Sequence, residues 1–158
     1  MPVQYFNIYT ADGYEGELVD SGPRVVQTGV LTSAQASYGK AVSRDTSVER
    51  GVSLADTGNI YAITQREYNR EAGTRPTDGT DFFYKQGDSV SLIRDGFIRL
   101  LVTVREAVAG ELANTNNTTG VFTGGAAGVG ETATTNVVWE ESGFVGEIVK
   151  ARIILAAS

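Results

Sequence analysis

Residues 89–104, with the sequence SVSLIRDGFIRLLVTV, contain the clearest local signal in the chain. An apolar run that ends at Ile93 leads into the dipeptide Asp95-Gly96, and a second apolar run begins at Ile98. Asp-Gly between two such runs is typical of a type I′ β-hairpin turn, because both central residues of that turn need a positive φ. The stretch therefore predicts two antiparallel strands that are joined at Asp95-Gly96.

The chain on either side of this stretch has the composition of a β protein. Of its 158 residues, 19 are glycine and only 3 are proline, and its apolar content depends strongly on valine and isoleucine. A chain of this kind is read as short strands joined by turns, and one domain is the default for its length. We therefore expect an all-β fold. It would be a single jelly-roll-like β-sandwich or barrel over residues 23–158, with residues 1–22 as an extended N-terminal arm.

Three stretches leave their local structure open. Residues 65–72 allow one or two helical turns, because a capping-box pattern begins at Thr64, but a turn or loop fits equally well. Residues 105–113 are interpreted as a continuing or paired strand. The Asn-, Thr-, Gly- and Ala-rich residues 114–136 are interpreted as a long loop or a wide hairpin. The last strand is expected within residues 144–155, after a turn that follows Trp139.

Missing residue types and the net charge exclude several classes of function. The chain has no cysteine and no histidine, which removes thiol nucleophiles, thiolate zinc sites, the usual general base at neutral pH and the commonest metal ligand. Nineteen acidic and thirteen basic residues give a net charge of −6. An acidic surface repels phosphate backbones, so we expect no nucleic-acid partner.

The sequence also contains no targeting or membrane signal. No apolar run approaches the roughly 20 residues that span a bilayer, and the first residues lack the pattern of a signal peptide. We expect a soluble protein that is made in the cytoplasm and has no membrane partner.

Two near-matches to nucleotide-binding motifs occur in the glycine-rich stretch at 125–133. The first departs from a P-loop because Glu131 stands where the motif needs a lysine to reach the phosphates. The second, a G-x-G-x-x-A pattern from Gly128, is followed by a strand-like segment, whereas that motif must open a helix. Adjacent Glu140 and Glu141 would face opposite sides of a strand and cannot share one site. We therefore expect no cofactor, no metal and no catalytic residues.

The N-terminal 23 residues are rich in aromatic and acidic side chains, and no basic residue precedes Arg24. Such a segment carries apolar area that needs cover, either on its own domain or on the surface of a partner. Trp139, the sole tryptophan, is interpreted either as a core aromatic or as an interface anchor. The expected partner-binding residues are Tyr5, Phe6, Tyr9, Tyr14 and Trp139.

The order of these segments resembles the structural cement, or capsid decoration, proteins of tailed bacteriophages with HK97-type shells. The resemblance covers residues 22–155 as a pattern of strands and turns. The matching stretches are YGKAV at 38–42, IYAITQRE at 60–67, YKQGDSVSLI at 84–93, DGFI at 95–98 with the apolar run to 104, NTTGVF at 117–122 and the closing 146–155.

This resemblance implies a small β domain on the outer surface of an icosahedral virion, made in the host cytoplasm. Such a protein binds across neighbouring subunits of the major capsid protein after the shell expands, often as a homodimer or homotrimer. It implies no reaction and no cofactor, and no individual functional residue is carried over from it. Two other classes remain open at this point, a carbohydrate-binding β-sandwich module of a virion or tail structure and a small β enzyme that uses carboxylates.

Overall fold

The computed structural model describes residues 13–19, 22–67 and 83–155. All regular structure in these ranges is β, which confirms the expected fold class. The strands are β1 (Val25–Leu31), β2 (Gln35–Ser37), β3 (Ala41–Asp45), β4 (Gly51–Leu54), β5 (Ala62–Thr64), β6 (Phe83–Lys85), β7 (Ser89–Leu101), β8 (Leu112–Asn116), β9 (Phe122–Thr123), β10 (Glu131–Trp139) and β11 (Ile148–Ile153). Within these ranges, no helix is long and apolar enough to span a membrane.

The first lobe is a closed barrel. Its strands follow the order β1-β4-β3-β5-β7, and a further pairing between β1 and β7 closes the ring. The β1–β4 pair is parallel and the other pairs are antiparallel. A separate two-stranded sheet of β2 and β6 packs buried side chains against the same interior. The buried cluster consists of Leu31, Ala36, Tyr38, Val42, Val52, Ala62, Tyr84, Val90 and Leu92.

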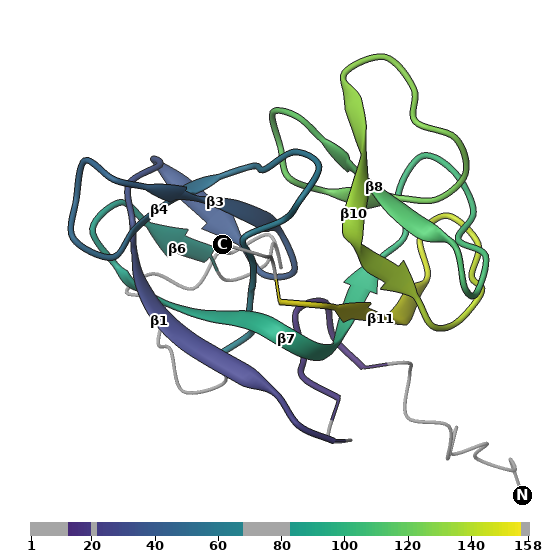
Figure 1. Ribbon diagram of the computed structural model, residues 1–158, viewed down its shortest axis with the longest axis horizontal. Coiled ribbons are helices and arrows are strands. Elements are labelled where there is room, and N and C mark those ends of the chain that lie inside the picture. Colours follow the sequence, from purple (N-terminus) through teal and green to yellow (C-terminus); the bar gives the residue numbers. More distant parts are fainter. Residues whose placement is uncertain (1–12, 20–21, 68–82, 156–158) are drawn as a thin grey trace, which may run out of the picture.

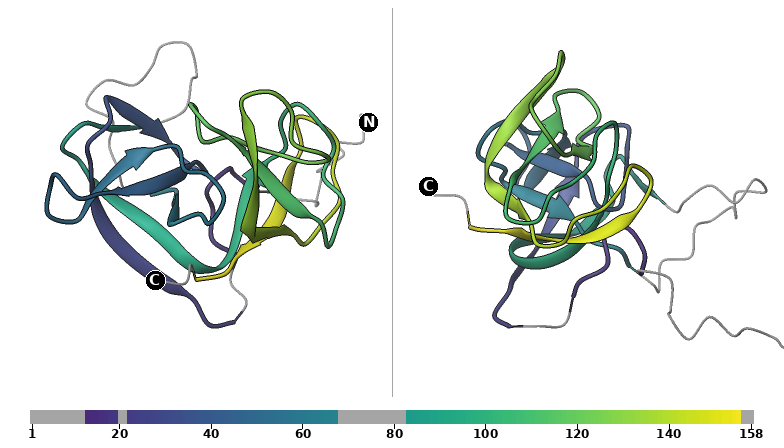
Figure 2. Two further views of the ribbon diagram at one scale, coloured as in Figure 1. Left: turned by 45° about the horizontal axis from the view of Figure 1, so that its top comes forward. Right: turned by 90° about the vertical axis from the view of Figure 1, so that its right-hand side faces the viewer.

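The second lobe continues from the C-terminal half of β7. From there the sheet runs through β11, β10 and β8 to β9, and a parallel bridge between Thr103 and Thr123 brings the chain after β7 back beside β9. Figure 1 shows the two lobes side by side, with β7 running from the first into the second, and Figure 2 shows them from two further directions. The second buried cluster lies mainly in this lobe, with Trp139 and Phe122 as its largest members.

The hairpin predicted at Asp95-Gly96 is wrong. β7 runs through this dipeptide as one strand of 13 residues. Gly96 does adopt a positive φ of 132°, but the chain continues in β7, and the β1–β7 register shifts just before the dipeptide, between Ile93 and Asp95, so that Arg94 is the extra residue of a bulge. The two flanking apolar runs pair with β1, β5 and β11 and not with each other, since these distant strands cover them better than a hairpin would.

Other local expectations are confirmed in part. Residues 105–111 form a loop before β8, with one isolated bridge between Ala107 and Gly143, so the strand expected there begins only at Leu112. Of the two alternatives for residues 114–136, the wide hairpin is confirmed, because β8 and β10 pair antiparallel and β9 pairs with the other edge of β8. Within the helical option at 65–72, residues 65–67 are not helical, and the remainder lies outside the described residues. The last strand, expected within residues 144–155, is β11, which pairs antiparallel with β10.

A buried asparagine links distant parts of the chain. Asn136 is 6% exposed, and its Oδ1 accepts the Ile60 N–H at 2.8 Å. Its Nδ2 donates to the carbonyl oxygens of Ile60 and Ile154, both at 2.9 Å. Because the side chain satisfies backbone groups of the segment before β5 and of the segment after β11, it fastens both of them to β10.

We predict that Asn136→Ala lowers the free energy of unfolding by about 3 kcal/mol, because the substitution leaves buried backbone groups without partners. Chemical denaturation measures this loss. Asn59→Ala is the matched control, since Asn59 is exposed and its loss should cost less than about 0.5 kcal/mol. Equal stabilities of the two variants would contradict the fastening role of Asn136.

Candidate functional site

Residues 13–19 lie along β7 on the edge opposite to β11. Gly16 donates its N–H to the carbonyl of Arg99 at 2.8 Å, and the N–H of Arg99 donates to the carbonyl of Glu17 at 2.9 Å. Leu18 packs against the buried cluster of the second lobe. This part of the expected arm is therefore docked on its own domain, through backbone hydrogen bonds and one antiparallel bridge between Leu18 and Ile98.

A cation–π stack fixes the beginning of this segment. The guanidinium carbon of Arg66 lies 4.9 Å from the ring centroid of Tyr14 and 4.8 Å from that of Tyr38. Tyr38 in turn meets Tyr84 edge to face, with centroids 5.4 Å apart. Such contacts contribute about 0.5–2 kcal/mol each, depending on their exposure to water. Tyr14, which remains 61% exposed, is thus held against the first lobe by Arg66.

An ion pair and backbone bonds complete the attachment. The Lys40 ammonium pairs with the Glu15 carboxylate, and both side chains are largely buried, at 12% and 13% exposure. The Arg66 N–H donates to the carbonyl of Gly16 at 2.7 Å, and its Nε donates to that of Glu15 at 3.1 Å. Segment 13–19 is therefore held by both lobes, and its position relative to the barrel is fixed.

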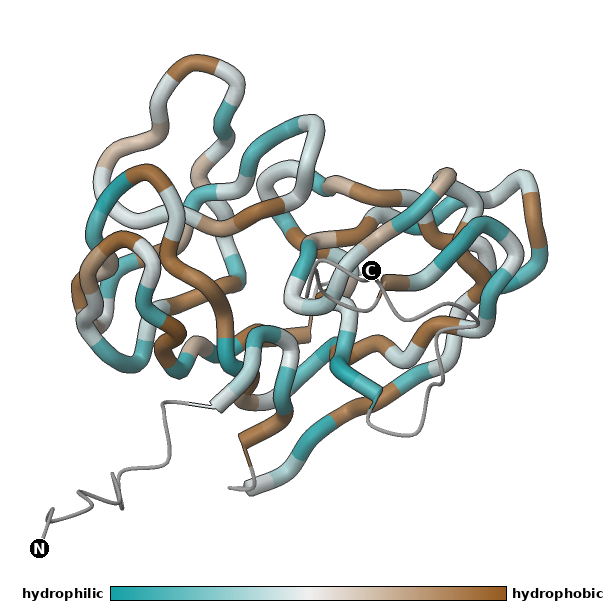
Figure 3. The backbone as a smooth tube through the Cα atoms, turned by 180° about the vertical axis from the view of Figure 1, so that it is seen from behind, coloured by the Kyte–Doolittle hydropathy of each residue, from teal (hydrophilic) through white to brown (hydrophobic). Residues whose placement is uncertain are grey.

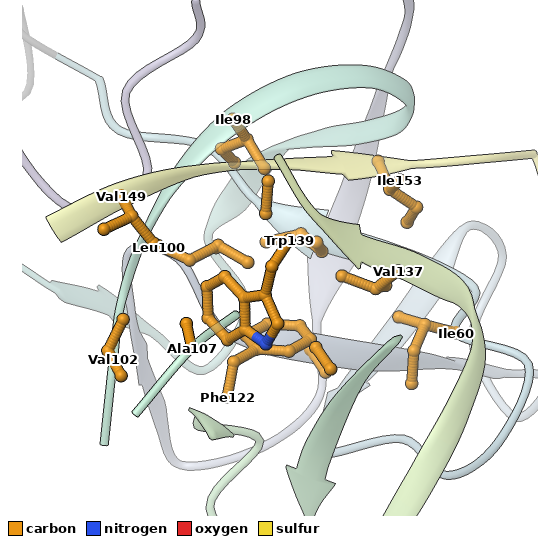
Figure 4. Close-up of a cluster of buried hydrophobic side chains, with 14 of the residues drawn as sticks. Ile60, Ile98, Leu100, Val102, Ala107, Phe122, Val137, Trp139, Val149 and Ile153 are labelled. Carbon is orange, nitrogen blue, oxygen red and sulfur yellow. The ribbon is translucent and has the colours of Figure 1, made fainter. Parts of the chain in front are cut away.

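The structure separates the five expected partner-binding residues. Tyr14 lies within the docked segment and is exposed. Trp139 is fully buried, and Figure 4 shows its ring among the apolar side chains of the second lobe. Trp139 is therefore a core aromatic residue and not an exposed interface anchor, because β10 directs its side chain inward. Tyr5, Phe6 and Tyr9 lie outside the described residues.

Sequence reasoning did not single out Arg66. Its guanidinium contacts the rings of Tyr14 and Tyr38, which are 24 residues apart in the sequence. No local sequence pattern predicts such a contact. The capping-box pattern that includes this residue pointed instead to a helix start, which the described part of the segment does not contain.

A shallow groove lies where β7 bends. Its volume is about 490 Å³, and its lining residues are Pro23, Arg24, Val25, Asp95, Phe97 and Arg152. The Phe97 ring has the Lys150 ammonium at 5.4 Å and the Arg152 guanidinium carbon at 5.6 Å from its centroid. The groove therefore offers an aromatic surface and cationic groups on an otherwise acidic protein.

The glycine-rich loop is closed by its own carboxylate. Glu131 accepts the Gly128 N–H at 2.8 Å and pairs with the Arg105 guanidinium. Burial raises the pKa of Glu131, but these bonds outweigh burial and leave the pKa below its ordinary value. A carboxylate already occupies the donors that a phosphate would need. Among the described residues, no group of three or more His, Cys, Asp or Glu side chains is placed to hold a metal ion.

Comparison with known protein families identifies the family of this chain. Residues 1–154 match the family described as structural cement protein (E217 gp24/Pam3 gp6). The chain belongs to this family. No curated protein matches this chain. A solved structure titled "The capsid of Myoviridae Phage XM1" contains a chain with the same fold, at a TM-score of 0.67 and 19% identity over 90% of both chains.

Membership of the cement family gives this protein a capsid-associated structural role in a phage virion. For a protein of this kind the functional site is a binding surface. The residues that matter are therefore the exposed ones that a rigid core holds in place.

The closure of the glycine-rich loop predicts a pH-dependent stability. Because the pKa of Glu131 is lowered in the folded state, its carboxylate stabilises the fold above the ordinary value of 4.5, and this contribution is lost as the pH falls. Glu131→Gln should therefore destabilise the protein by about 1 kcal/mol at pH 7 and by progressively less below pH 4.5. Thermal melts from pH 7 to pH 3 measure the difference. Glu140→Gln, at an exposed carboxylate, serves as control, and a difference that grows with acidity would contradict the assignment.

Proposed function

We propose that this protein binds the outer surface of an HK97-type phage head across neighbouring subunits of the major capsid protein and stabilises the expanded shell. The observation that carries the proposal is the docked segment 13–19, which belongs to a chain of the cement family. It gives the preceding aromatic residues a fixed starting point on a rigid barrel. Tyr5, Phe6 and Tyr9 are the proposed anchors, with Tyr14 at the base of the arm.

The energetics of a repeating shell support this proposal. A capsid presents many identical sites, and a homodimer or homotrimer that engages several of them converts modest single contacts into firm attachment. Aromatic side chains are common anchors of interfaces, because each buries a large apolar area. An extended segment can also add a strand to the exposed sheet edge of a partner. No bond is made or broken, so the output of the protein is binding energy that resists rupture of the shell.

We predict that deletion of residues 1–12 weakens binding to expanded shells at least about tenfold, because the proposed anchors are lost. The melting temperature should stay within about 2 °C of the wild-type value, since segment 13–19 keeps its bonds to β7. Occupancy of purified empty expanded shells and their resistance to rupture are the measurements. Undiminished occupancy would contradict the proposed arm.

Point variants separate the anchors from the length of the arm. A triple variant with Tyr5→Ser, Phe6→Ser and Tyr9→Ser should bind as weakly as the deletion. Phe83→Ser is the matched control, because Phe83 is an exposed aromatic residue on β6, and it should bind like wild type. Deletion of residues 1–22 removes the docked segment as well, so it should lower the melting temperature in addition to shell binding.

A further inference from the structure

Two loops lie side by side at one end of the second lobe. Residues 102–111 and 140–147 are joined by reciprocal backbone bonds between Ala107 and Gly143, at 2.9 and 3.1 Å. The Val102 N–H donates to the carbonyl of Glu147 at 2.9 Å. These bonds hold both loops in a defined position relative to each other.

The loops expose apolar side chains that their neighbours do not cover. The end patch consists of Phe144, Val104, Val145 and Val108, which are 65%, 64%, 54% and 47% exposed. Ala107, between two of these valines, is buried, so the chain turns one residue to the core and its neighbours to solvent. Figure 3 shows apolar stretches on the loops of this lobe. Exposed apolar residues that gather on neighbouring loops, with polar residues around them, are typical of interaction sites.

Val104 adds an independent observation. Its φ is +59°, and the Arg105 N–H donates to the carbonyl of Thr103 at 2.6 Å, which closes a γ-turn with Val104 at its centre. A β-branched residue is a poor choice for positive φ, where a valine costs roughly 1–2 kcal/mol relative to glycine. The side chain is mostly exposed, so its packing in the core does not offset this strain. An exposed, strained, apolar residue favours a role in binding.

The charges around the patch determine what it can bind. The same two loops carry five exposed carboxylates, whereas their one arginine, Arg105, is paired with Glu131. The carboxylates are those of Glu106, Glu111, Glu140, Glu141 and Glu147. In a two-fold contact with a second copy, these carboxylates would face their own equivalents and repel them. A surface with an apolar centre and a lysine- or arginine-bearing rim is complementary to the end patch.

We infer that the end patch is a second docking surface for the shell, and that it binds an apolar site flanked by basic side chains of the major capsid protein. This inference rests on the proposed function and extends it. Segment 13–19 is held by residues of both lobes, and the end patch lies on the loops at 102–111 and 140–147. The end patch would add a contact with the shell beyond the arm of the proposed function.

Phe144→Ser tests the apolar centre of the patch. We expect its affinity for expanded empty shells to fall at least about tenfold, as for a central interface aromatic. Val129→Ser is the control, because Val129 is fully exposed on the glycine-rich loop outside the patch, and it should bind like wild type. If the wild-type protein binds shells and Phe144→Ser binds them with the same affinity, the inference is overturned and the proposed function stands. No binding by the wild-type protein would instead overturn the proposed function.

Glu106→Lys tests the acidic rim against Glu49→Lys, which makes the same change of charge on the exposed turn between β3 and β4. We expect Glu106→Lys to bind shells several-fold more weakly than Glu49→Lys at low salt. This difference in affinity should decrease as the salt concentration rises, because salt screens the charges. Equal affinities of the two variants at low salt would overturn the charge complementarity.

Val104→Asn separates binding from folding. Asparagine tolerates positive φ better than valine, so the melting temperature should rise by roughly 2–4 °C while shell affinity falls. Unchanged affinity of this variant would overturn the role of Val104 in docking. Sedimentation of wild type and Phe144→Ser checks the competing occupant, because dissociation of a wild-type oligomer by this substitution would show that the patch binds a second copy.

Discussion

The constraint on which this structure depends is that β7 serves two lobes at once. Through its first half it pairs with β1 on one edge and β5 on the other, and through its second half with β11 and with the segment 13–19. Alternate side chains, Val90 and Leu92 before the bend and Ile98 and Leu100 after it, point into the interiors. A single strand therefore contributes side chains to both buried clusters.

This arrangement explains how a chain without helices presents loops and a terminal segment at fixed positions. Asn136 ties the segment before β5 and the segment after β11 to β10, and the Tyr14–Arg66–Tyr38 stack ties residues 13–19 to the first lobe. Contacts with several different segments thus fix the exposed parts of the protein relative to the strands. Preorganisation of this kind reduces the entropy that is lost when a surface binds its partner.

The sequence predicted the fold class because composition alone, with frequent glycine and β-branched residues, favours short strands. It failed at Asp95-Gly96, where a correct local feature, a glycine with positive φ, was assigned to a turn although distant strands supply better partners for both flanking runs. The stack around Arg66 and the exposure of Phe144 depend on contacts between segments far apart in the chain, so no local pattern predicts them. The resemblance that pointed to the cement family agrees with the family match, which spans nearly the whole chain.

The shared strand also has a mechanical consequence. Segment 13–19 runs antiparallel to β7, and its hydrogen bonds lie across the direction of the strand. A force that pulls the N-terminal segment along the axis of β7 would act on all of these hydrogen bonds at the same time, in shear. The bonds would therefore not break one after another. Tension entering at one lobe would then pass along a continuous backbone to the other, without crossing a flexible linker.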